Sequence, residues 1–112
     1  MSDCLFCKIV AGEIPSSKVY EDDVCYAFND IDPQAPTPFL VVPKAHIGSV
    51  SEITADNSTV VAHIFEVIAK LTKEKGLDSY RVVSNIGEQA GQSVFHLHFH
   101  VLSGRDMTWP PG

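Results

Sequence analysis

The 112-residue chain lacks any run of eighteen apolar residues, so the sequence predicts no membrane-spanning helix. Its first residues, MSDCLFCK, lack the basic patch and apolar core of a secretory signal, which makes a cytoplasmic location the expectation. Basic residues are also scarce: 8 Lys and Arg stand against 14 Asp and Glu, for a formal net charge of -6. Because such a surface repels a polyanion, we expect no nucleic-acid partner, and without a spanning helix we expect no membrane partner.

Cysteine is sparse too, with only Cys4, Cys7 and Cys25 present. An odd number of cysteines in a chain without an export signal argues against a disulfide framework. Cys4 and Cys7 form a C-x-x-C motif, which is typical of half a zinc site or of a redox pair. A redox pair usually follows a strand of a βαβ unit, whereas only three residues precede Cys4. The motif therefore favours zinc, provided that two further ligands exist.

Internal repeats are absent, and only one segment has the length and period of a long helix. Residues 56–75 carry apolar side chains at helical spacing and stop at Gly76, while residues 5–11 predict a short helix that ends at Gly12. The apolar stripe of the long helix is wider than one core face needs. We therefore expect part of it to pack on a second subunit, with burial under a loop as the alternative. The hydrophobic fraction of 45% suits a single domain over residues 1–112.

Five β-rich runs are predicted as strands: 17–22, 24–30, 39–43, 80–86 and 95–103. The first two are separated only by Asp23, which indicates a hairpin, and the second is apolar at both parities, which predicts cover on both faces. Residues 31–38 carry three prolines and suit neither a helix nor a central strand, so we expect an ordered loop there. The succession predicts an α+β domain with a five-stranded, mainly antiparallel sheet, because a parallel doubly wound sheet would need more helices.

The run SVFHLHFHVL (93–102) places His96, His98 and His100 at alternate positions, with apolar residues between them. Strand periodicity puts the histidines on one face, where we expect them to look outward into a groove, and the apolar residues on the core face. Same-face neighbours are about 7 Å apart along a strand. That spacing suits two histidines on one metal ion and equally two contacts to one phosphate, so both interpretations remain open at this point.

The segment GEQAGQS just before this run favours a phosphate. Gly87 and Gly91 allow backbone N–H groups to approach a small anion closely, and Ser93 adds a hydroxyl. A neutral imidazole is a good nucleophile toward phosphorus near neutral pH, and its neighbours can fix its tautomer. Together these residues indicate a phosphate cradle beside a row of histidines.

Residues 96–102, HLHFHVL, match the signature of the histidine triad (HIT) superfamily, His-x-His-x-His-x-x with x hydrophobic. Beyond the signature, FCKIVAGEIPSSKVYEDD, AFNDIDPQAPTPFLVVPKAHI, GQSVFHLHFHVL and the ending GRDMTWPPG resemble the Hint branch, the histidine triad nucleotide-binding proteins, over nearly the whole chain. The resemblance implies a HIT-like fold and a homodimer formed through the long helix and a strand. It also implies hydrolysis of purine nucleoside 5'-phosphoramidates, with a nucleotide of the AMP or GMP type as substrate.

By this resemblance, His98 is the nucleophile that attacks the α-phosphorus and becomes covalently nucleotidylated. His100 would hydrogen-bond the α-phosphate and, with Ser93, protonate or hold the leaving amine, while Asp30 would accept hydrogen bonds from the ribose. The remaining implied nucleotide contacts are Asn85 and the backbone N–H groups of Gly91, Gln92, Ser93 and Val94 for the phosphate, Phe6, Ile14, Phe28 and Ile31 for the base, and Trp109, which in the family reaches the partner subunit's site.

The resemblance further implies a structural zinc ion held by Cys4, Cys7, His46 and His96, a closed tetrahedral set that leaves His98 and His100 for catalysis. Reduced, unmetallated thiols are the alternative. Cys25 is expected in the core and His63 at the surface or an interface.

Two other functions stay open for the sequence. One is a dinucleoside polyphosphate hydrolase or nucleotidylyltransferase, which would use the same central histidine on P–O bonds. The other is a zinc-containing nucleotide-binding protein with vestigial activity.

Overall fold

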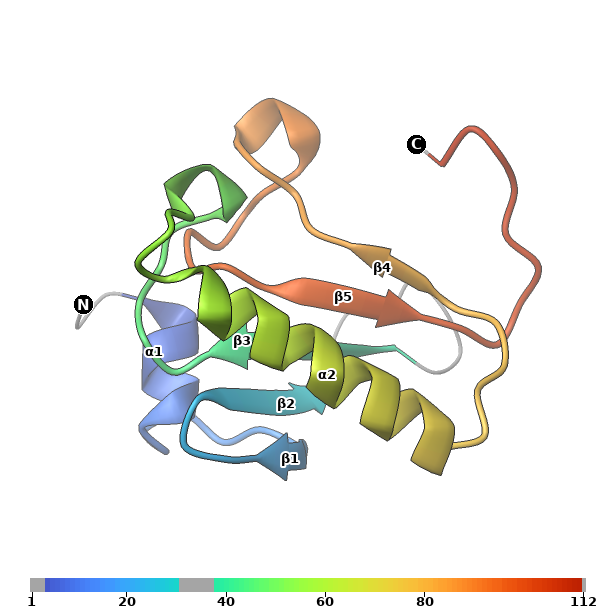
Figure 1. Cartoon of the computed structure of the whole chain (residues 1–112), viewed down its shortest axis with the longest axis horizontal. Coiled ribbons are helices and arrows are strands. Elements are labelled where there is room, and N and C mark those ends of the chain that lie inside the picture. Colours follow the sequence, from blue (N-terminus) through green and yellow to red (C-terminus); the bar gives the residue numbers. More distant parts are fainter. Residues whose placement is uncertain (1–3, 31–37, 112) are drawn as a thin grey trace.

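The computed structural model describes residues 4–30 and 38–111, and its centre is a five-stranded sheet (Figure 1). In the order of the sheet, the strands are β1 (Lys18–Glu21), β2 (Cys25–Asn29), β3 (Phe39–Pro43), β5 (Phe99–Leu102) and β4 (Arg81–Val83). Every neighbouring pair is antiparallel. This confirms the predicted α+β class and the hairpin at Asp23. Most of the proline-rich loop expected at 31–38 lies outside the described residues.

The two α-helices cover opposite faces of the sheet. Helix α2 (Ser58–Glu74) crosses the front of the sheet in Figure 1, and its buried stripe of Ile64, Val67, Ile68 and Leu71 packs in one core cluster with Cys25 and Ala27 of β2. Helix α1 (Leu5–Val10) contributes Phe6 and Ile9 to a second cluster, which contains Tyr26 and Phe28 of β2. Successive side chains of β2 therefore pack alternately into the two core clusters, which confirms the prediction that this strand is covered on both faces.

Both C-terminal strands are shorter than predicted. β4 covers Arg81–Val83 instead of 80–86, and β5 covers Phe99–Leu102 instead of 95–103. The ladder of backbone hydrogen bonds between β4 and β5 ends because the next groups have other partners. The Ser84 hydroxyl donates to the carbonyl of His98 at 2.8 Å, and the Leu97 N–H donates to the carbonyl of Ile47 at 2.6 Å. The chain between the strands forms the 3-10 turn η2 (Glu88–Ala90), as the segment after β3 forms η1 (Val50–Glu52).

The alternation of the histidine run holds although most of it precedes β5. Leu97, Phe99 and Val101 lie in the core under α2, while His96 and His98 face α1. The groove expected beside the histidines is present for two of them, since His98 and His100 line a cavity. The prediction is wrong for His96, which is 0% exposed and outside that cavity, and His98 is itself only 6% exposed. The ring of Phe6 covers them, with its centroid 5.0 Å from that of His98 and 6.0 Å from that of His96.

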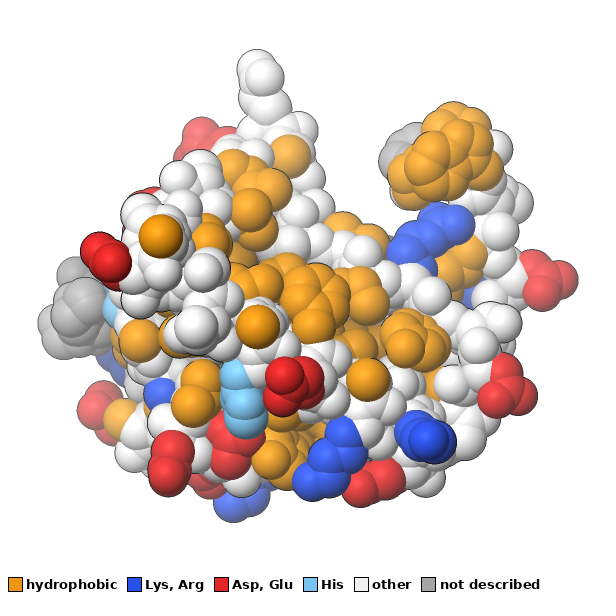
Figure 2. Space-filling model, in the orientation of Figure 1, with side chains coloured by type: hydrophobic (Ala, Val, Ile, Leu, Met, Phe, Trp, Pro, Cys, Tyr) orange, Lys and Arg blue, Asp and Glu red, His pale blue; other side chains and the backbone are white. Residues whose placement is uncertain are grey.

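Hydrophobic side chains gather on the outer face of α2 and beside it in Figure 2. Phe65 is 45% exposed, and its ring lies 5.2 Å from that of Phe99. The apolar stripe therefore continues past the core onto the surface, as the width of the stripe predicts. Within the described part of the chain, none of the helices combines the length and hydrophobicity that a membrane span requires.

Candidate functional site

A cavity of about 410 Å³ lies on the α1 face of the sheet, where α1, β2 and the histidine run meet. That volume is in the range of small-molecule sites. Its lining includes most of the residues singled out from the sequence: Phe6, Ile14, Phe28, Asp30, Asn85, Gly91, Ser93, Val94, His98 and His100. Residues that sequence reasoning missed are Leu5, Ile9, Pro15, Ser16, Asn29 and Leu40. Of these, Ile9 could have been found, because it follows Phe6 by three positions on one helix face.

The tautomer of His98 is fixed by a backbone carbonyl. Its Nδ1 lies 2.7 Å from the carbonyl oxygen of His96, and because a carbonyl only accepts, Nδ1 carries the proton. In the neutral ring, Nε2 is then the unprotonated nitrogen. Burial lowers the pKa of His98 below its ordinary value, against the opposing effects of that hydrogen bond and of Asp30. His98 therefore offers a neutral imidazole with Nε2 as a nucleophile near neutral pH.

His100 lies beside His98 and faces an acid. The two imidazole centroids are 5.0 Å apart, and Nδ1 of His100 lies 3.7 Å from a carboxylate oxygen of Asp30. Burial and the neighbouring His98 lower the pKa of His100, while Asp30 opposes this shift. A basic ring beside a carboxylate in a cavity is able to exchange a proton with a bound group.

An apolar slot flanks these rings. Phe6 and Phe28 meet edge to face with centroids 5.6 Å apart, and both are buried. Ile14 packs against the same cluster, which also contains Leu40. A flat aromatic ligand, such as a base, fits the chemistry of this wall. Ile31, predicted for the same slot, lies outside the described residues.

A further part of the lining comes from the segment Gly87–Val94, which contributes Gly91, Ser93 and Val94. Gly91 has φ of +97°, a left-handed conformation that side chains disfavour, and the exposed Ser93 lines the cavity beside it. The implied phosphate contact of Gln92 is through its backbone N–H and stays a prediction. Its side chain is 4% exposed and does not line the cavity, since its amide is bonded to backbone groups. Trp109 also lies away from the cavity, 82% exposed in the C-terminal segment, which Arg81 holds through a hydrogen bond to the Thr108 carbonyl.

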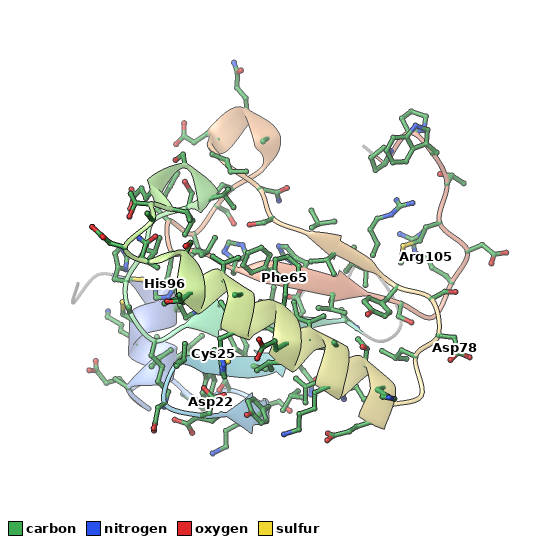
Figure 3. All side chains as sticks on the ribbon, viewed as in Figure 1. Asp22, Cys25, Phe65, Asp78, His96 and Arg105 are labelled. Carbon is green, nitrogen blue, oxygen red and sulfur yellow. The ribbon has the colours of Figure 1, made fainter. Side chains whose placement is uncertain are left out.

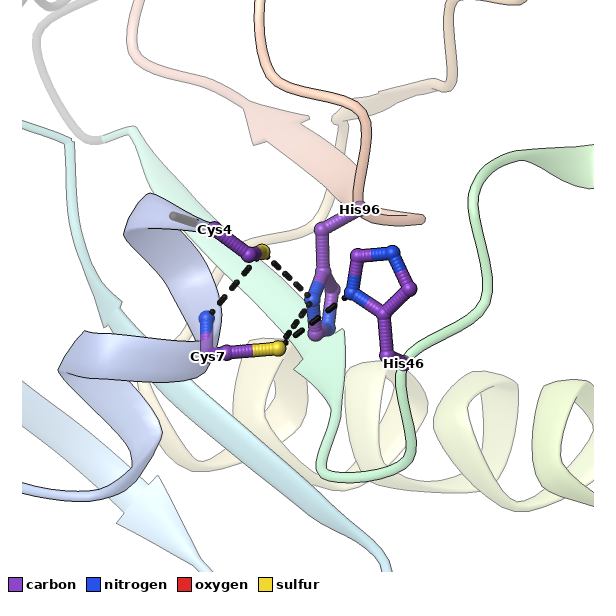
Figure 4. Close-up of side chains that lie close together, drawn as sticks. All are labelled: Cys4, Cys7, His46 and His96. Atoms are coloured by element: carbon purple, nitrogen blue, oxygen red, sulfur yellow. Dashed lines mark hydrogen bonds between the residues drawn. The ribbon is translucent and has the colours of Figure 1, made fainter. Parts of the chain in front are cut away.

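The four predicted metal ligands converge on one point (Figure 4). Cys4 Sγ lies 3.3 Å from His96 Nδ1, Cys7 Sγ 3.3 Å from His46 Nδ1, and all four ligand atoms lie within 4.8 Å of one another. A tetrahedral zinc ion with bonds of about 2.3 Å to sulfur and about 2.0 Å to nitrogen requires sulfur–nitrogen separations of about 3.5 Å. The donor set and its spacing therefore fit zinc.

The surroundings of His96 also suit a metal ligand. Its Nε2 donates to the carbonyl of Pro43 at 2.8 Å, which leaves Nδ1 as the bare nitrogen that faces both sulfurs. Burial, followed by the neighbouring Cys4, raises the pKa of the Cys7 thiol, so that a metal ion would have to displace its proton.

Asp22 and Cys25 of the hairpin, labelled in Figure 3, form a second group of potential ligands with His63 of α2. Here the residues bond directly to one another: His63 Nε2 lies 2.6 Å from the Asp22 carboxylate, which also accepts the Cys25 N–H at 2.9 Å. Burial, followed by Asp22, raises the pKa of Cys25 to about 12, so its thiol stays protonated. Cys25 is thus a core residue, as predicted, and His63 has a structural partner that the sequence did not indicate.

Comparisons with known proteins agree with this geometry. The family model described as scavenger mRNA decapping enzyme C-term binding matches residues 3–109. An uncharacterised HIT-like protein of Synechococcus elongatus is 45% identical, with 98% of this chain and 97% of that protein covered.

Two solved structures are similar throughout. A HIT family hydrolase from Legionella pneumophila is 48% identical with a TM-score of 0.95, over 98% of this chain and 100% of that one. A histidine triad protein from Clostridium difficile is 51% identical with a TM-score of 0.93, over 96% of each chain. With its alternating histidines gathered at one cavity and at the cysteine pair beside it, the chain belongs to the histidine triad superfamily.

Proposed function

We propose that this protein hydrolyses the P–N bond of purine nucleoside 5'-phosphoramidates through a covalent intermediate on His98. The observation that carries the proposal is the environment of His98, whose Nδ1 is bonded to the His96 carbonyl while the ring lines a cavity with an apolar slot. The kinship with HIT family hydrolases supports hydrolysis, and the likeness to the Hint branch supports the phosphoramidate substrate.

In the proposed reaction, the purine occupies the slot between Phe6 and Phe28, and Asp30 binds the ribose hydroxyls. The phosphate then lies between His98, His100 and the segment that contains Ser93. Asn85, whose amide lies beside Gly91, is available to the phosphate from the same wall. This arrangement places the phosphorus against a neutral ring whose orientation is already fixed, which reduces the cost of reaching the transition state.

The first step forms a bond from His98 Nε2 to phosphorus and breaks the bond to the amine, which leaves with the electron pair and takes up a proton. His100 and Ser93 hold the leaving nitrogen and assist that proton transfer. Water then attacks the phosphorus, the histidine–phosphorus bond breaks, and the nucleoside monophosphate and neutral His98 are released. Both the substrate and the intermediate contain a P–N bond, so neither step is steeply uphill.

We also propose a structural zinc ion on Cys4, Cys7, His46 and His96. When bound, the ion would join α1 to the loop after β3 and to the start of the histidine run. It would supply rigidity and leave the chemistry to His98 and His100. A homodimer through the outer face of α2 completes the proposal and would bury the exposed ring of Phe65.

The test is turnover of adenosine 5'-phosphoramidate by the wild type and by His98→Asn. The asparagine amide can still donate to the His96 carbonyl but offers no nucleophile, so we expect kcat to fall by about 10⁴-fold or more. The matched control is His63→Asn, which removes a histidine from α2 on the other face of the sheet and should retain kcat.

Mass spectrometry of quenched wild-type reactions should detect a nucleotidyl adduct that is absent from His98→Asn. Equal turnover by His98→Asn and the wild type would refute the nucleophile, and absence of turnover in the wild type would refute the activity. Faster cleavage of diadenosine polyphosphates than of phosphoramidates would favour the P–O hydrolase instead.

A further inference from the structure

The segment Gly87–Val94 contributes Gly91, Ser93 and Val94 to the lining of the cavity, and its one buried polar side chain is that of Gln92, which is 4% exposed. This side chain points away from the proposed nucleotide. It lines a separate hollow on the other side of the segment, together with His46, Gly48 and Gly87. The Gln92 side chain is therefore not positioned to contact a substrate in the cavity.

Every polar atom of the Gln92 side chain is used to tie backbone together. Its Oε1 accepts the N–H of Gly87 at 2.9 Å, and its Nε2 donates to the carbonyls of Gly48 at 2.8 Å and Val94 at 3.1 Å. The first and third of these bonds brace the two ends of the segment. The second joins the segment to the loop that follows β3 and carries His46.

We infer that Gln92 is a positioning residue that holds the phosphate-binding wall in place without touching the phosphate. The inference rests on the proposed function and deepens it, since it assigns the shape of the phosphate site to a residue outside the cavity. Its chain neighbours Gly91 and Ser93 line the cavity, so a shift of Gln92 moves both.

These three bonds require both the oxygen and the NH₂ group of a carboxamide, carried on a side chain as long as that of glutamine. A side chain without N–H donors would leave the carbonyls of Gly48 and Val94 without these bonds, and one without an acceptor would release the N–H of Gly87. Gly87 and Gly91 have φ of +87° and +97°, so the segment has two flexible residues between which the Gln92 bonds fix one conformation. Phosphate contacts that depend on backbone direction are lost when such a segment relaxes.

The experiment compares the affinities of AMP and adenosine by calorimetry for the wild type, Gln92→Met and Gln89→Met. Methionine matches glutamine in length but makes none of the three hydrogen bonds. Gln89 is exposed in the same segment, so it provides the same substitution as a control. In the proposed function, adenosine contacts the slot and Asp30 but lacks the phosphate that Gly91 and Ser93 would contact, so its affinity reports whether the fold and the slot, against which Val94 packs, survive.

For Gln92→Met we expect the preference for AMP over adenosine to fall by about tenfold, with adenosine affinity retained within about twofold. Gln89→Met should keep the wild-type preference. Gln92→Glu, which keeps the acceptor and length but loses the donors, should also lose preference for AMP.

An unchanged preference in Gln92→Met, with normal phosphoramidate turnover, would overturn the inference and leave the proposed function standing. Equal losses for AMP and adenosine would overturn it as well, because they would indicate a general structural role. If the wild type neither binds AMP more tightly than adenosine nor turns over phosphoramidate, the proposed function is refuted, and the inference with it.

Discussion

Asp22 is the centre of the contact between the β1–β2 hairpin and α2, and replacing it by asparagine should destabilise the protein. One carboxylate oxygen accepts the N–H groups of Val24 and Cys25 at 2.8 and 2.9 Å, and the other accepts the Tyr20 hydroxyl at 2.9 Å and His63 Nε2 at 2.6 Å. Asparagine keeps an oxygen for the two backbone groups. It presents an NH₂ group to the other two partners, which are donors.

The magnitude follows from the two bonds that are lost. Hydrogen bonds to a charged group contribute about 1.5–3 kcal/mol each. The side chains of Asp22 and His63 are 22% and 35% exposed, so water replaces part of what is lost. We expect Asp22→Asn to lower the free energy of unfolding by about 2 kcal/mol at pH 7, a large fraction of a typical stability of roughly 5–15 kcal/mol.

The difference should depend on pH in a definite direction. Burial by itself would raise the pKa of Asp22, but the hydrogen bonds from His63, the backbone of Cys25 and Val24, and Tyr20 outweigh it and hold the pKa below its ordinary value of 3.8. A depressed carboxyl pKa in the folded state stabilises the protein above the unfolded pKa of about 3.9, and this stabilisation is lost as pH falls below it. The difference in the free energy of unfolding between the wild type and Asp22→Asn should therefore reach its full size at pH 7 and be smaller at pH 3.

Urea denaturation at both pH values measures this gap. The control is Asp23→Asn, the adjacent and exposed acid, which should change stability by less than about 0.5 kcal/mol. The reasoning fails if Asp22→Asn unfolds at the wild-type urea midpoint at pH 7. It also fails if the difference persists undiminished at pH 3.

Two further predictions concern the metal and the dimer. Elemental analysis should find one zinc per chain in the wild type and in Cys25→Ala but much less in Cys7→Ser, because Cys7 belongs to the Cys2His2 cluster and Cys25 does not; equal zinc in all three proteins would contradict the site. Analytical ultracentrifugation should show a dimer that Phe65→Lys dissociates, with the dissociation constant raised by about thirtyfold or more, because a charge cannot be buried at the centre of an apolar interface. Glu74→Lys, at the end of α2, should leave the dimer intact, and a monomeric wild type would refute the interface.

The spacing of apolar residues and the residue types in turns are local properties of the sequence, and they were sufficient to predict the helix α2 and the strands. Apolar spacing predicted α2, and the alternation in 24–30 predicted a strand with two covered faces, because each side chain's direction depends only on the backbone beside it. The lengths of β4 and β5 were wrong because they depend on a remote bond. Ser84 takes the His98 carbonyl, and no pattern in either segment shows that exchange.

The candidate site likewise has features that local motifs indicated and features that depend on contacts between distant parts of the sequence. Motif resemblance placed His98, His100, Ser93 and Asp30 at one site, and they line one cavity. It did not show that the Gln92 side chain is buried and bonded to backbone groups outside the cavity, because the sequence G-Q-S is the same whether that side chain faces the ligand or the backbone. The bond between Asp22 and His63 was equally invisible, because 41 positions separate two polar residues that each suit a surface.

The three histidines show how far alternation alone can lead. Their period fixes a shared face, yet each has a different environment because a different element meets it: the cysteines before and within α1 meet His96, Phe6 meets His98, and Asp30 at the end of β2 meets His100. A helix of six residues has little stability of its own, so α1 must be held by its contacts. In the proposed zinc-bound state, the same short helix would carry both the metal ligands and the wall of the base slot. The division of labour among the histidines thus arises from what packs against the strand.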